Sequence, residues 1–192
     1  GFRVTYATMS ADNEELHKGY EEGIEEAKAE LGRFHPAVVN GEERKGEGSY
    51  QLHSPIDSDI ILGSFAQASV QDVNDALDLL RPVWDKGSGK DGYVSLEVDP
   101  NLAYDTEGTT AEAVRLHKLV DKPNLFVKIP ATKPGLPAIE DMIAKGKSIN
   151  VTLIFSLERY EEVARAYIRG LERLVAGGGD PSTVASVASF FV

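Results

Sequence analysis

From about residue 70 onward, short apolar runs alternate with amphipathic helical stretches. The apolar runs cover residues 93–98, 125–131, 149–155 and 184–192, and the segments between them carry apolar side chains at helical spacing. Strands and helices that alternate in this way form β-α-β units, which place the strands parallel to one another in a single sheet. We therefore predict an α/β fold with about four parallel strands over residues 71–192.

Polar side chains interrupt the apolar strands at regular positions. Because successive side chains of a strand point to opposite faces, the intervening apolar residues form one face, on which helices can pack. The polar residues then share the other face, which predicts the interior of a barrel rather than a sheet covered by helices on both sides. The residues placed on this polar face are Ser95, Glu97, Lys128, Asn150, Thr152 and Ile154, whereas Leu153 is expected to face the helices.

Lys128 lies among apolar neighbours, where an ammonium group is costly unless another group pairs with it or uses it. Burial lowers the pKa of a lysine, which makes its amine a nucleophile for carbonyl chemistry. The alternative is a lysine that extends its amine to solvent at the end of a strand. Glu97 is either a proton-transfer group or a structural partner of Lys128. Asn150 and Thr152 either bind a substrate or hydrogen-bond within the barrel interior.

Composition excludes several classes of function. A net charge of −11 and the lack of a basic stripe argue against binding to nucleic acid or to an anionic membrane surface. The chain has no cysteine, which excludes disulfides and thiolate chemistry. Its apolar runs are too short to span a bilayer, and residues 1–20 lack a signal-peptide core, so we predict a cytoplasmic protein. The four histidines lack ligand spacing, and no metal site is predicted.

Residues 1–70 differ in character from the rest of the chain. Residues 1–8 are predicted to be an extended arm, and Asp12 is predicted to cap a helix with Glu15 completing a capping box. Asn40-Gly41 is typical of a two-residue β-hairpin turn, and residues 49–53 and 59–65 would continue an antiparallel meander.

Further helix starts are predicted at Thr109, with Glu112 as its capping partner, and at Ser156. Asp99 and Asp105 are expected to cap or orient loops rather than to catalyse.

Five sequence blocks between residues 72 and 192 resemble the strand blocks of the transaldolase family, in the same order. They are residues 95–100, 105–109, 127–132, 150–156 and 185–192. The resemblance implies a (β/α)₈ TIM barrel in which Lys128 forms a Schiff base with a ketose phosphate. It also implies that Glu97 assists proton transfer through a bound water that Thr152 positions. Asn150 would hold substrate hydroxyls or the imine, and Ser189 would line the sugar pocket.

The same resemblance implies an activity, which is the transfer of a dihydroxyacetone unit between sugar phosphates in the pentose phosphate pathway. The expected substrates are fructose 6-phosphate, sedoheptulose 7-phosphate, erythrose 4-phosphate and glyceraldehyde 3-phosphate. No metal or organic cofactor is expected, because the protonated imine supplies the electrophile.

Residues 1–70 instead resemble the amino-terminal arm of glutamate-semialdehyde (pyrroline-carboxylate) dehydrogenases. The resemblance is carried by residues 5–14, 30–36, 40–42 and 54–57. The catalytic cysteine and the cofactor-binding segments of those enzymes have no counterpart, so dehydrogenase chemistry is not implied. The chain is therefore interpreted as a chimera, natural or artificial, as a truncated chain or as a misassembled sequence. The boundary between the two resemblances is expected within residues 68–76.

The sequence also departs from the transaldolase pattern. The first two strands of that family, with a catalytic aspartate and an Asn-Pro turn that binds substrate, have no match, and the chain stops before the arginine that binds the sugar phosphate. Half a barrel has two unpaired strand edges, which favour association. An alternative to the enzyme is therefore a non-catalytic fragment that folds by self-association as a homo-oligomer, or an oligomerisation arm of the dehydrogenase type.

Overall fold

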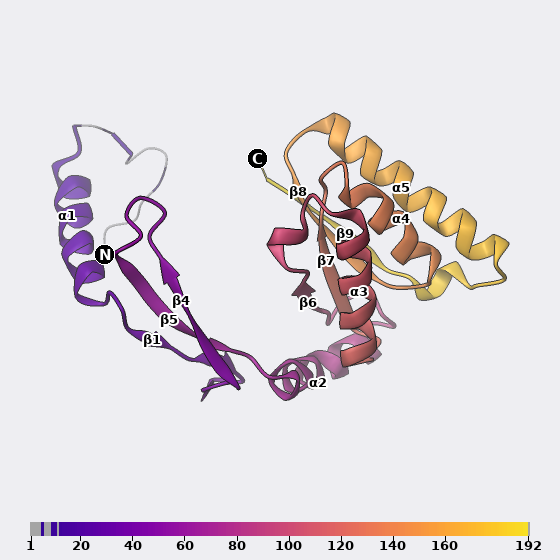
Figure 1. Ribbon diagram of the computed structural model, residues 1–192, viewed down its shortest axis with the longest axis horizontal. Helices are drawn as coiled ribbons and strands as arrows, with labels where there is room; N and C mark the ends of the chain where they lie inside the picture. Colours follow the sequence, from indigo (N-terminus) through magenta and orange to yellow (C-terminus); the bar gives the residue numbers. More distant parts are fainter. Residues whose placement is uncertain (1–4, 6–8, 11, 192) are drawn as a thin grey trace. The chain divides into compact units, whose positions relative to one another are not determined.

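The computed structural model describes residues 5, 9–10 and 12–191, which form two compact units, Gly1–Ser69 and Val70–Val192. The arm expected over residues 1–8 lies, apart from Thr5, outside the described residues, as does Val192 at the end of the last expected strand. Each unit is described by itself below, and Figure 1 gives the labels of the elements.

In its described residues, the first unit combines one helix, α1 (Glu14–Ala29), with five short strands. β4 (Gly48–His53) pairs antiparallel with β5 (Ile61–Gln67), as expected, whereas β1 (Phe34–His35) pairs parallel with β5. β2 (Ala37–Val39) and β3 (Glu42–Arg44) form a separate hairpin. Its turn residues, Asn40 and Gly41, have φ angles of 55° and 76°, which is the backbone that an Asn-Gly hairpin turn requires, so this prediction is confirmed.

The start of α1 differs from the prediction by one residue. Asn13, not Asp12, occupies the N-cap, and its Oδ1 accepts a hydrogen bond from the backbone N–H of Leu16 at 3.1 Å. Aspartate and asparagine side chains can both cap a helix. Because α1 starts one residue later than predicted, the amide of Asn13 takes the place expected for the carboxylate of Asp12. None of the residues of α1 is buried, so its apolar stripe lies on the surface of this unit.

The second unit is a four-stranded parallel sheet with helices between the strands. Its order is β6-β7-β8-β9, and all three neighbouring pairs are parallel. Along the chain the elements are α2 (Val70–Lys86), β6 (Val94–Glu97), η1 (Pro100–Leu102), α3 (Thr106–Val120), β7 (Leu125–Pro130), α4 (Gly135–Ala144), β8 (Ile149–Ile154), α5 (Leu157–Ala176), η2 (Pro181–Thr183) and β9 (Ser186–Phe190). The predicted α/β architecture is confirmed.

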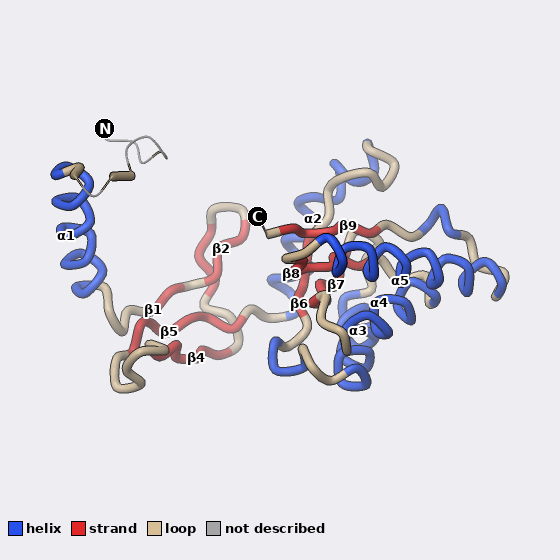
Figure 2. Tube along the Cα trace, turned by 90° about the horizontal axis from the view of Figure 1, so that it is seen from above, coloured by secondary structure: helices blue, strands red, loops and turns tan. Residues whose placement is uncertain are grey.

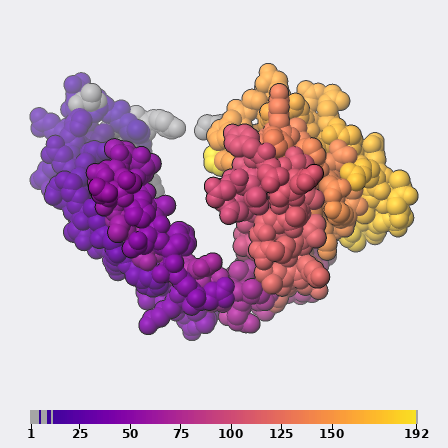
Figure 3. All heavy atoms as spheres, viewed as in Figure 1, coloured from indigo at the N-terminus to yellow at the C-terminus, as the bar shows by residue number. Residues whose placement is uncertain are grey.

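Three helices cover one face of this sheet. α3 and α4 contact β7, and α4 and α5 contact β8, so these helices lie side by side along the sheet (Figure 1). Their atoms form one continuous outer surface of the unit (Figure 3). The core lies between the helices and the sheet. Its fully buried side chains include Val127, Ile129, Ile139, Met142, Ile143, Ile149 and Val151. The alternation of apolar residues along the strands therefore places one face against the helices, as predicted.

Aspartates cap the turns that follow β6. The side chain of Asp99 accepts a hydrogen bond from the N–H of Asn101 at 2.8 Å, and that of Asp105 accepts one from Gly108 at 2.9 Å. The expectation that both cap or orient loops is confirmed. α3 therefore begins at Thr106, and the predicted start at Thr109 is wrong. Thr109 lies inside the helix, buried, where its hydroxyl donates to the carbonyl of Leu102.

β8 contains an irregularity that changes which side chains are buried. Val151 pairs with Ala188 but Ile154 pairs with Phe190, and Leu153 between them has a φ of 59°. This left-handed residue shifts the alternation by one position. As a result, Leu153 is exposed and Ile154 is fully buried in the core. The predicted placement of Ile154 on the polar face and of Leu153 against the helices is therefore wrong.

The face of the sheet that lacks helices is concave. The side-chain amide of Asn150 on β8 donates to the hydroxyl of Ser95 on β6 at 3.1 Å, although β7 lies between these two strands. Two strand spacings in a flat sheet amount to roughly 9.5 Å, which is too far for these short side chains. The sheet must therefore curve around this face, as the sheet of a barrel does. Figure 2 shows the strands of this sheet in red beside the helices α3, α4 and α5.

Candidate active site

Three polar side chains from three neighbouring strands form one row across the concave face. Glu97 on β6 is in register with Lys128 on β7, and Lys128 is in register with Asn150 on β8. Side chains in register on adjacent parallel strands share a face and lie close together. A carboxylate, an amine and an amide are thus brought together by strand pairing alone.

Lys128 and Glu97 form an ion pair, with 2.5 Å between the Nζ and Oε1 atoms. The side chain of Lys128 is 25% exposed and that of Glu97 is 62% exposed. The acid is therefore on the same side of the sheet as the amine, as expected. The expected isolation from solvent is not present in this unit, because its concave face is open and four strands do not surround it.

Asn150 connects the row to the rest of the face. Its Nδ2 donates to Ser95 Oγ, and its Oδ1 accepts a hydrogen bond from the hydroxyl of Ser189 on β9 at 2.9 Å. This chain of contacts spans the sheet from one edge strand to the other. It fixes the orientation of the amide beside Lys128, and it brings Ser189, a residue chosen only by resemblance, into contact with the predicted site.

Thr152 lies two residues beyond Asn150 along β8, in register with Pro130. Its side chain is buried, and its hydroxyl oxygen has no hydrogen-bond partner among the described residues. A buried hydroxyl without a partner destabilises a protein by about 1–3 kcal/mol. Thr152 therefore offers hydrogen-bonding capacity that the fold itself does not use.

Two stacked aromatic side chains lie beside this row, toward the amino-terminal ends of the strands. The rings of Tyr93 and Phe126 stack with their centroids 4.0 Å apart. Together with Ser95 and Asn150 they line an open cavity of about 570 Å³. Tyr93 was not among the predicted site residues. Its position directly before β6 and its aromatic character were the only signals that could have indicated this role.

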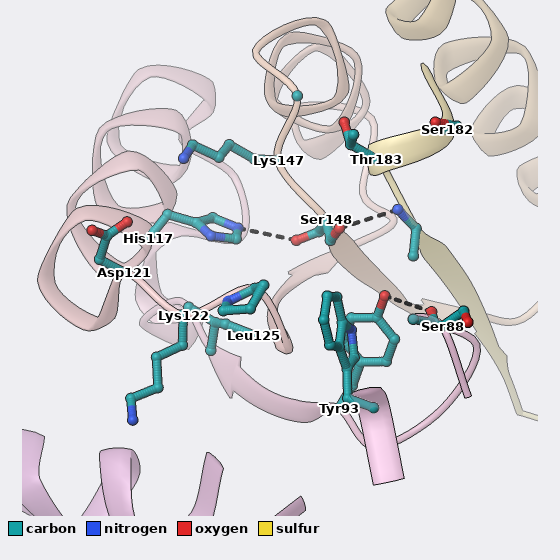
Figure 4. A pocket seen from close by; sticks show the side chains of 15 residues that line it. Ser88, Tyr93, His117, Asp121, Lys122, Leu125, Lys147, Ser148, Ser182 and Thr183 are labelled. Atoms are coloured by element: carbon teal, nitrogen blue, oxygen red, sulfur yellow. Dashed lines mark hydrogen bonds between the residues drawn. The ribbon is translucent and has the colours of Figure 1, made fainter. Parts of the chain in front are cut away.

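A second hollow, of about 600 Å³, lies at the amino-terminal ends of the strands (Figure 4). Its walls include Tyr93, Leu125, Ser148 and Ala185, each of which starts or directly precedes a strand. The hydroxyl of Ser148 accepts a hydrogen bond from the backbone N–H of Ala185, and Tyr93 donates to the carbonyl of Gly89. These polar groups are used within the fold. In β/α barrels the carboxyl-terminal ends of the strands carry the active site, and this hollow lies at the opposite end of the strands.

His117 of α3 points into the same region and is buried, although the sequence places it on a polar helix. Its Nε2 lies 3.0 Å from the carbonyl oxygen of Ser148, so we assign the neutral tautomer that donates from Nε2. Burial, followed by the charge of Lys147, lowers the pKa of His117 from 6.5 to about 4, against the opposing effect of the Ser148 hydrogen bond. His117 is a structural residue that is neutral near pH 7.

Among the described residues, no three histidine, cysteine, aspartate or glutamate side chains are grouped closely enough to hold a metal ion. None of the helices within the described ranges is both long and apolar enough to cross a membrane.

The fold and the site define a class of protein. A parallel β/α sheet, curved as in a barrel and carrying a lysine beside a carboxylate on its concave face, is typical of barrel enzymes that act on carbonyl compounds. Comparison with protein families agrees: the model of the transaldolase/fructose-6-phosphate aldolase family matches residues 56–192. The chain belongs to this family. The match begins before residue 72, where the resemblance was expected to start, and it includes β5 of the first unit.

Several curated proteins are similar to part of the chain. Transaldolase 1 of Streptomyces avermitilis is 63% identical over 121 residues, which cover 63% of this chain and 32% of that protein. The transaldolase of Parafrankia is 62% identical over 121 residues, and that of Mycobacterium leprae is 56% identical over 124 residues; in both, 33% of the relative is covered. The aligned segment thus spans about a third of the length of the relatives.

A solved structure of 1-pyrroline-5-carboxylate dehydrogenase from Thermus with bound NAD aligns with 98% of this chain and 45% of that chain. The TM-score is 0.38 and the sequence identity is 13%, values too low to show a shared fold.

Proposed function

We propose that this chain carries transaldolase-type chemistry, in which Lys128 forms a Schiff base with a ketose phosphate. The observation that supports the proposal is the row of Glu97, Lys128 and Asn150 on the concave face, within a segment that belongs to the transaldolase/fructose-6-phosphate aldolase family. A primary amine beside a carboxylate is the arrangement that imine formation needs.

The first step forms the imine. The Lys128 amine must lose its extra proton before it attacks, and Glu97 Oε1, 2.5 Å from Nζ, is placed to receive that proton. Nζ then bonds to the keto carbon, and the resulting carbinolamine loses its hydroxyl group as water. The product is a protonated imine, and water is the only group released.

The protonated imine withdraws electrons, and this makes cleavage of a carbon–carbon bond of the sugar possible. The bond between C3 and C4 of the sugar breaks, its electron pair moves toward the imine nitrogen to give an enamine, and the C4 hydroxyl loses its proton as the aldehyde leaves. In the proposal, Glu97 exchanges this proton through a water held by Thr152, whose buried hydroxyl lacks a partner in the fold. The retained three-carbon unit then adds to the carbonyl of an acceptor aldose phosphate, and hydrolysis frees the lysine.

Asn150 and Ser189 are proposed to bind the sugar. Asn150 is held by Ser95 and Ser189, so its amide is fixed in position before a substrate arrives. The proposed donors are fructose 6-phosphate and sedoheptulose 7-phosphate, and the proposed acceptors are erythrose 4-phosphate and glyceraldehyde 3-phosphate, as in the pentose phosphate pathway.

Reductive trapping tests the proposal. The chain is incubated with fructose 6-phosphate and borohydride, and its peptides are then examined by mass spectrometry. We expect added mass on the peptide that contains Lys128 and none in the Lys128→Ala variant. Lys122 is a matched control, because it is also ion-paired, with Asp78, at 23% and 62% side-chain exposure. Trapping that is unaffected by Lys128→Ala, or equal at Lys122, would reject the mechanism.

A non-catalytic role is the second candidate, and one observation favours it. The carboxylate of Glu97 is mostly exposed and the concave face is open, whereas imine chemistry benefits from a site that excludes water. Turnover of fructose 6-phosphate by the purified chain, lost in Lys128→Ala, would exclude this candidate.

For residues 1–70 we propose an association arm of the kind found in pyrroline-carboxylate dehydrogenases. The support is the apolar stripe of α1, in which no residue is buried, together with the hairpin of β2 and β3. Loss of association on Tyr20→Glu, with unchanged helix content, is the expected result. Association that is unaffected by this substitution would argue against the arm.

A further inference from the structure

Ser95 and Asn150 belong to one layer of side chains on the concave face. The side chains inside a β/α barrel are arranged in layers, and each layer takes its residues from alternate strands. β6 and β8 are alternate strands of this sheet, with β7 between them. The hydrogen bond from Asn150 Nδ2 to Ser95 Oγ joins the two strands across β7. We call this contact the Ser95–Asn150 bridge.

The bridge crosses β7 on the amino-terminal side of Lys128. Ser95 is in register with Phe126, and Asn150 is in register with Lys128, so the bridge runs diagonally between these two levels of β7. Phe126 and Lys128 are two residues apart, which is roughly 6.6 Å along a strand, and they point to the same face. The bridge therefore lies between the stem of Lys128 and the ring of Phe126, which stacks on Tyr93.

A second hydroxyl holds the other end of the same amide. Ser189 on β9 donates to Asn150 Oδ1 at 2.9 Å, whereas Ser95 accepts from Nδ2. The χ2 angle of an asparagine is otherwise broadly distributed. Because the two contacts use opposite ends of the amide, together they determine this angle and with it the direction of each polar atom of Asn150.

The amide keeps hydrogen-bonding capacity beyond these two contacts. An asparagine side chain has two N–H donors and an oxygen with two lone pairs. The bridge uses one N–H and Ser189 uses one lone pair, so one donor and one acceptor remain beside Lys128. Interior layers of β/α barrels are mostly filled by valine, isoleucine and leucine. A serine and an asparagine in such a layer are therefore better explained by the amide that they hold in place than by packing.

We infer that Ser95 is a positioning residue of this site, which holds the Asn150 amide and the stem of Lys128 in their reactive arrangement before a sugar binds. Ser95 acts through the bridge and does not itself have to touch the sugar. The inference rests on the proposed Schiff-base chemistry of Lys128, to which it adds a residue with no role in that proposal beyond its contact with Asn150. Without the bridge the amide can rotate, and the reactive arrangement is present for less of the time.

The rate of reductive trapping tests the inference. The full chain is incubated with fructose 6-phosphate and borohydride, and the initial rate of mass addition at Lys128 is measured. Ser95→Ala should slow this rate roughly fivefold to tenfold, which is the range of effect expected for one hydrogen bond. Ser182→Ala is the control, because it also removes a hydroxyl that donates to a side chain, the carboxylate of Asp180, but lies on η2, outside the row.

A matched pair of variants separates the hydroxyl from the shape of the side chain. Threonine and valine have nearly the same shape, and both suit a strand. Ser95→Thr keeps the hydroxyl and should be trapped faster than Ser95→Val, which lacks it. This comparison also holds if Ser95→Ala does not fold. Equal rates for the two variants, with cooperative melting of both, would overturn the inference.

A double substitution tests whether Ser95 acts through Asn150. Asn150→Ala removes the bridge by itself, so adding Ser95→Ala should slow trapping no further. A further slowing in the double variant would overturn the positioning role, because Ser95 would then act independently of the amide. Trapping that Ser95→Ala leaves unchanged would overturn this inference alone and leave the proposed function standing. Absence of trapping at Lys128 in the unsubstituted chain would overturn both.

Discussion

Acid should lower the free energy of unfolding of the second unit through one residue, His117. Burial, with a smaller effect from the charge of Lys147, lowers the pKa of its imidazole to about 4 in the folded chain, against an ordinary value of 6.5. Between these two values the unfolded chain binds a proton that the folded chain does not. The free energy of unfolding therefore rises with pH through this window, and the contribution of His117 is fully present above pH 6.5 and is lost as the pH falls toward 4.

The size of the effect follows from the two pKa values. Each tenfold difference in proton affinity corresponds to about 1.4 kcal/mol, so the full contribution of His117 is about 3 kcal/mol. Between pH 7 and pH 5 the unfolded imidazole becomes almost fully protonated while the folded one stays neutral, and about 2 kcal/mol of this is lost. That is a large part of the stability of a domain of this size.

Denaturant unfolding at pH 7 and pH 5 measures this loss, and the chain contains a convenient probe. Trp84, its single tryptophan, lies in α2 of the same unit and lines the same hollow as His117. The matched variant is His117→Gln, which keeps a side-chain N–H donor but does not titrate. The two proteins share all other titrating groups, so the difference between their pH dependences belongs to His117. If both lose the same stability between pH 7 and pH 5, the argument is wrong.

Two further substitutions have defined outcomes. Thr152→Val removes the buried hydroxyl that has no partner, so the melting temperature should stay level or rise while borohydride trapping at Lys128 slows. A marked loss of stability would show that the hydroxyl is bonded within the fold. Gly170→Ala should destabilise the chain by about 1–3 kcal/mol in denaturant unfolding, because its Cβ would lie 2.7 Å from the carbonyl oxygen of Glu140. Gly23→Ala on α1 has open space around the added Cβ and should not destabilise the chain, so equal effects of the two substitutions would refute the argument.

Features that depend on local chemistry could be predicted from the sequence. The Asn40-Gly41 turn requires left-handed backbone at both residues, and few dipeptides adopt it as readily. Ser156 was expected at the start of a helix and caps α5 by accepting from the N–H of Arg159. The shared face of Glu97, Lys128 and Asn150 follows from the period of a strand, and the observed registers agree with it.

Features set by neighbours distant in the sequence could not be predicted. His117 has the flanking residues of an exposed helix, and its burial depends on Ser148, 31 residues away, whose carbonyl it meets. The left-handed Leu153 reverses the alternation at the end of β8 without any glycine or proline to indicate it. The start of α3 was misplaced because Thr109 and Asp105 are both suitable caps, and only the backbone geometry distinguishes them.

The candidate site separates into two properties with different structural origins. The position of the amine beside the carboxylate and the amide comes from three adjacent strands, and it exists in one copy because strand pairing within that copy sets it. Exclusion of water is a property of the whole barrel, and four strands with two free edges do not provide it. Electrostatic interactions between these groups strengthen when water is removed, so closure would act on a site whose geometry is already set. The open face of the four described strands therefore does not argue against the row as a catalytic site.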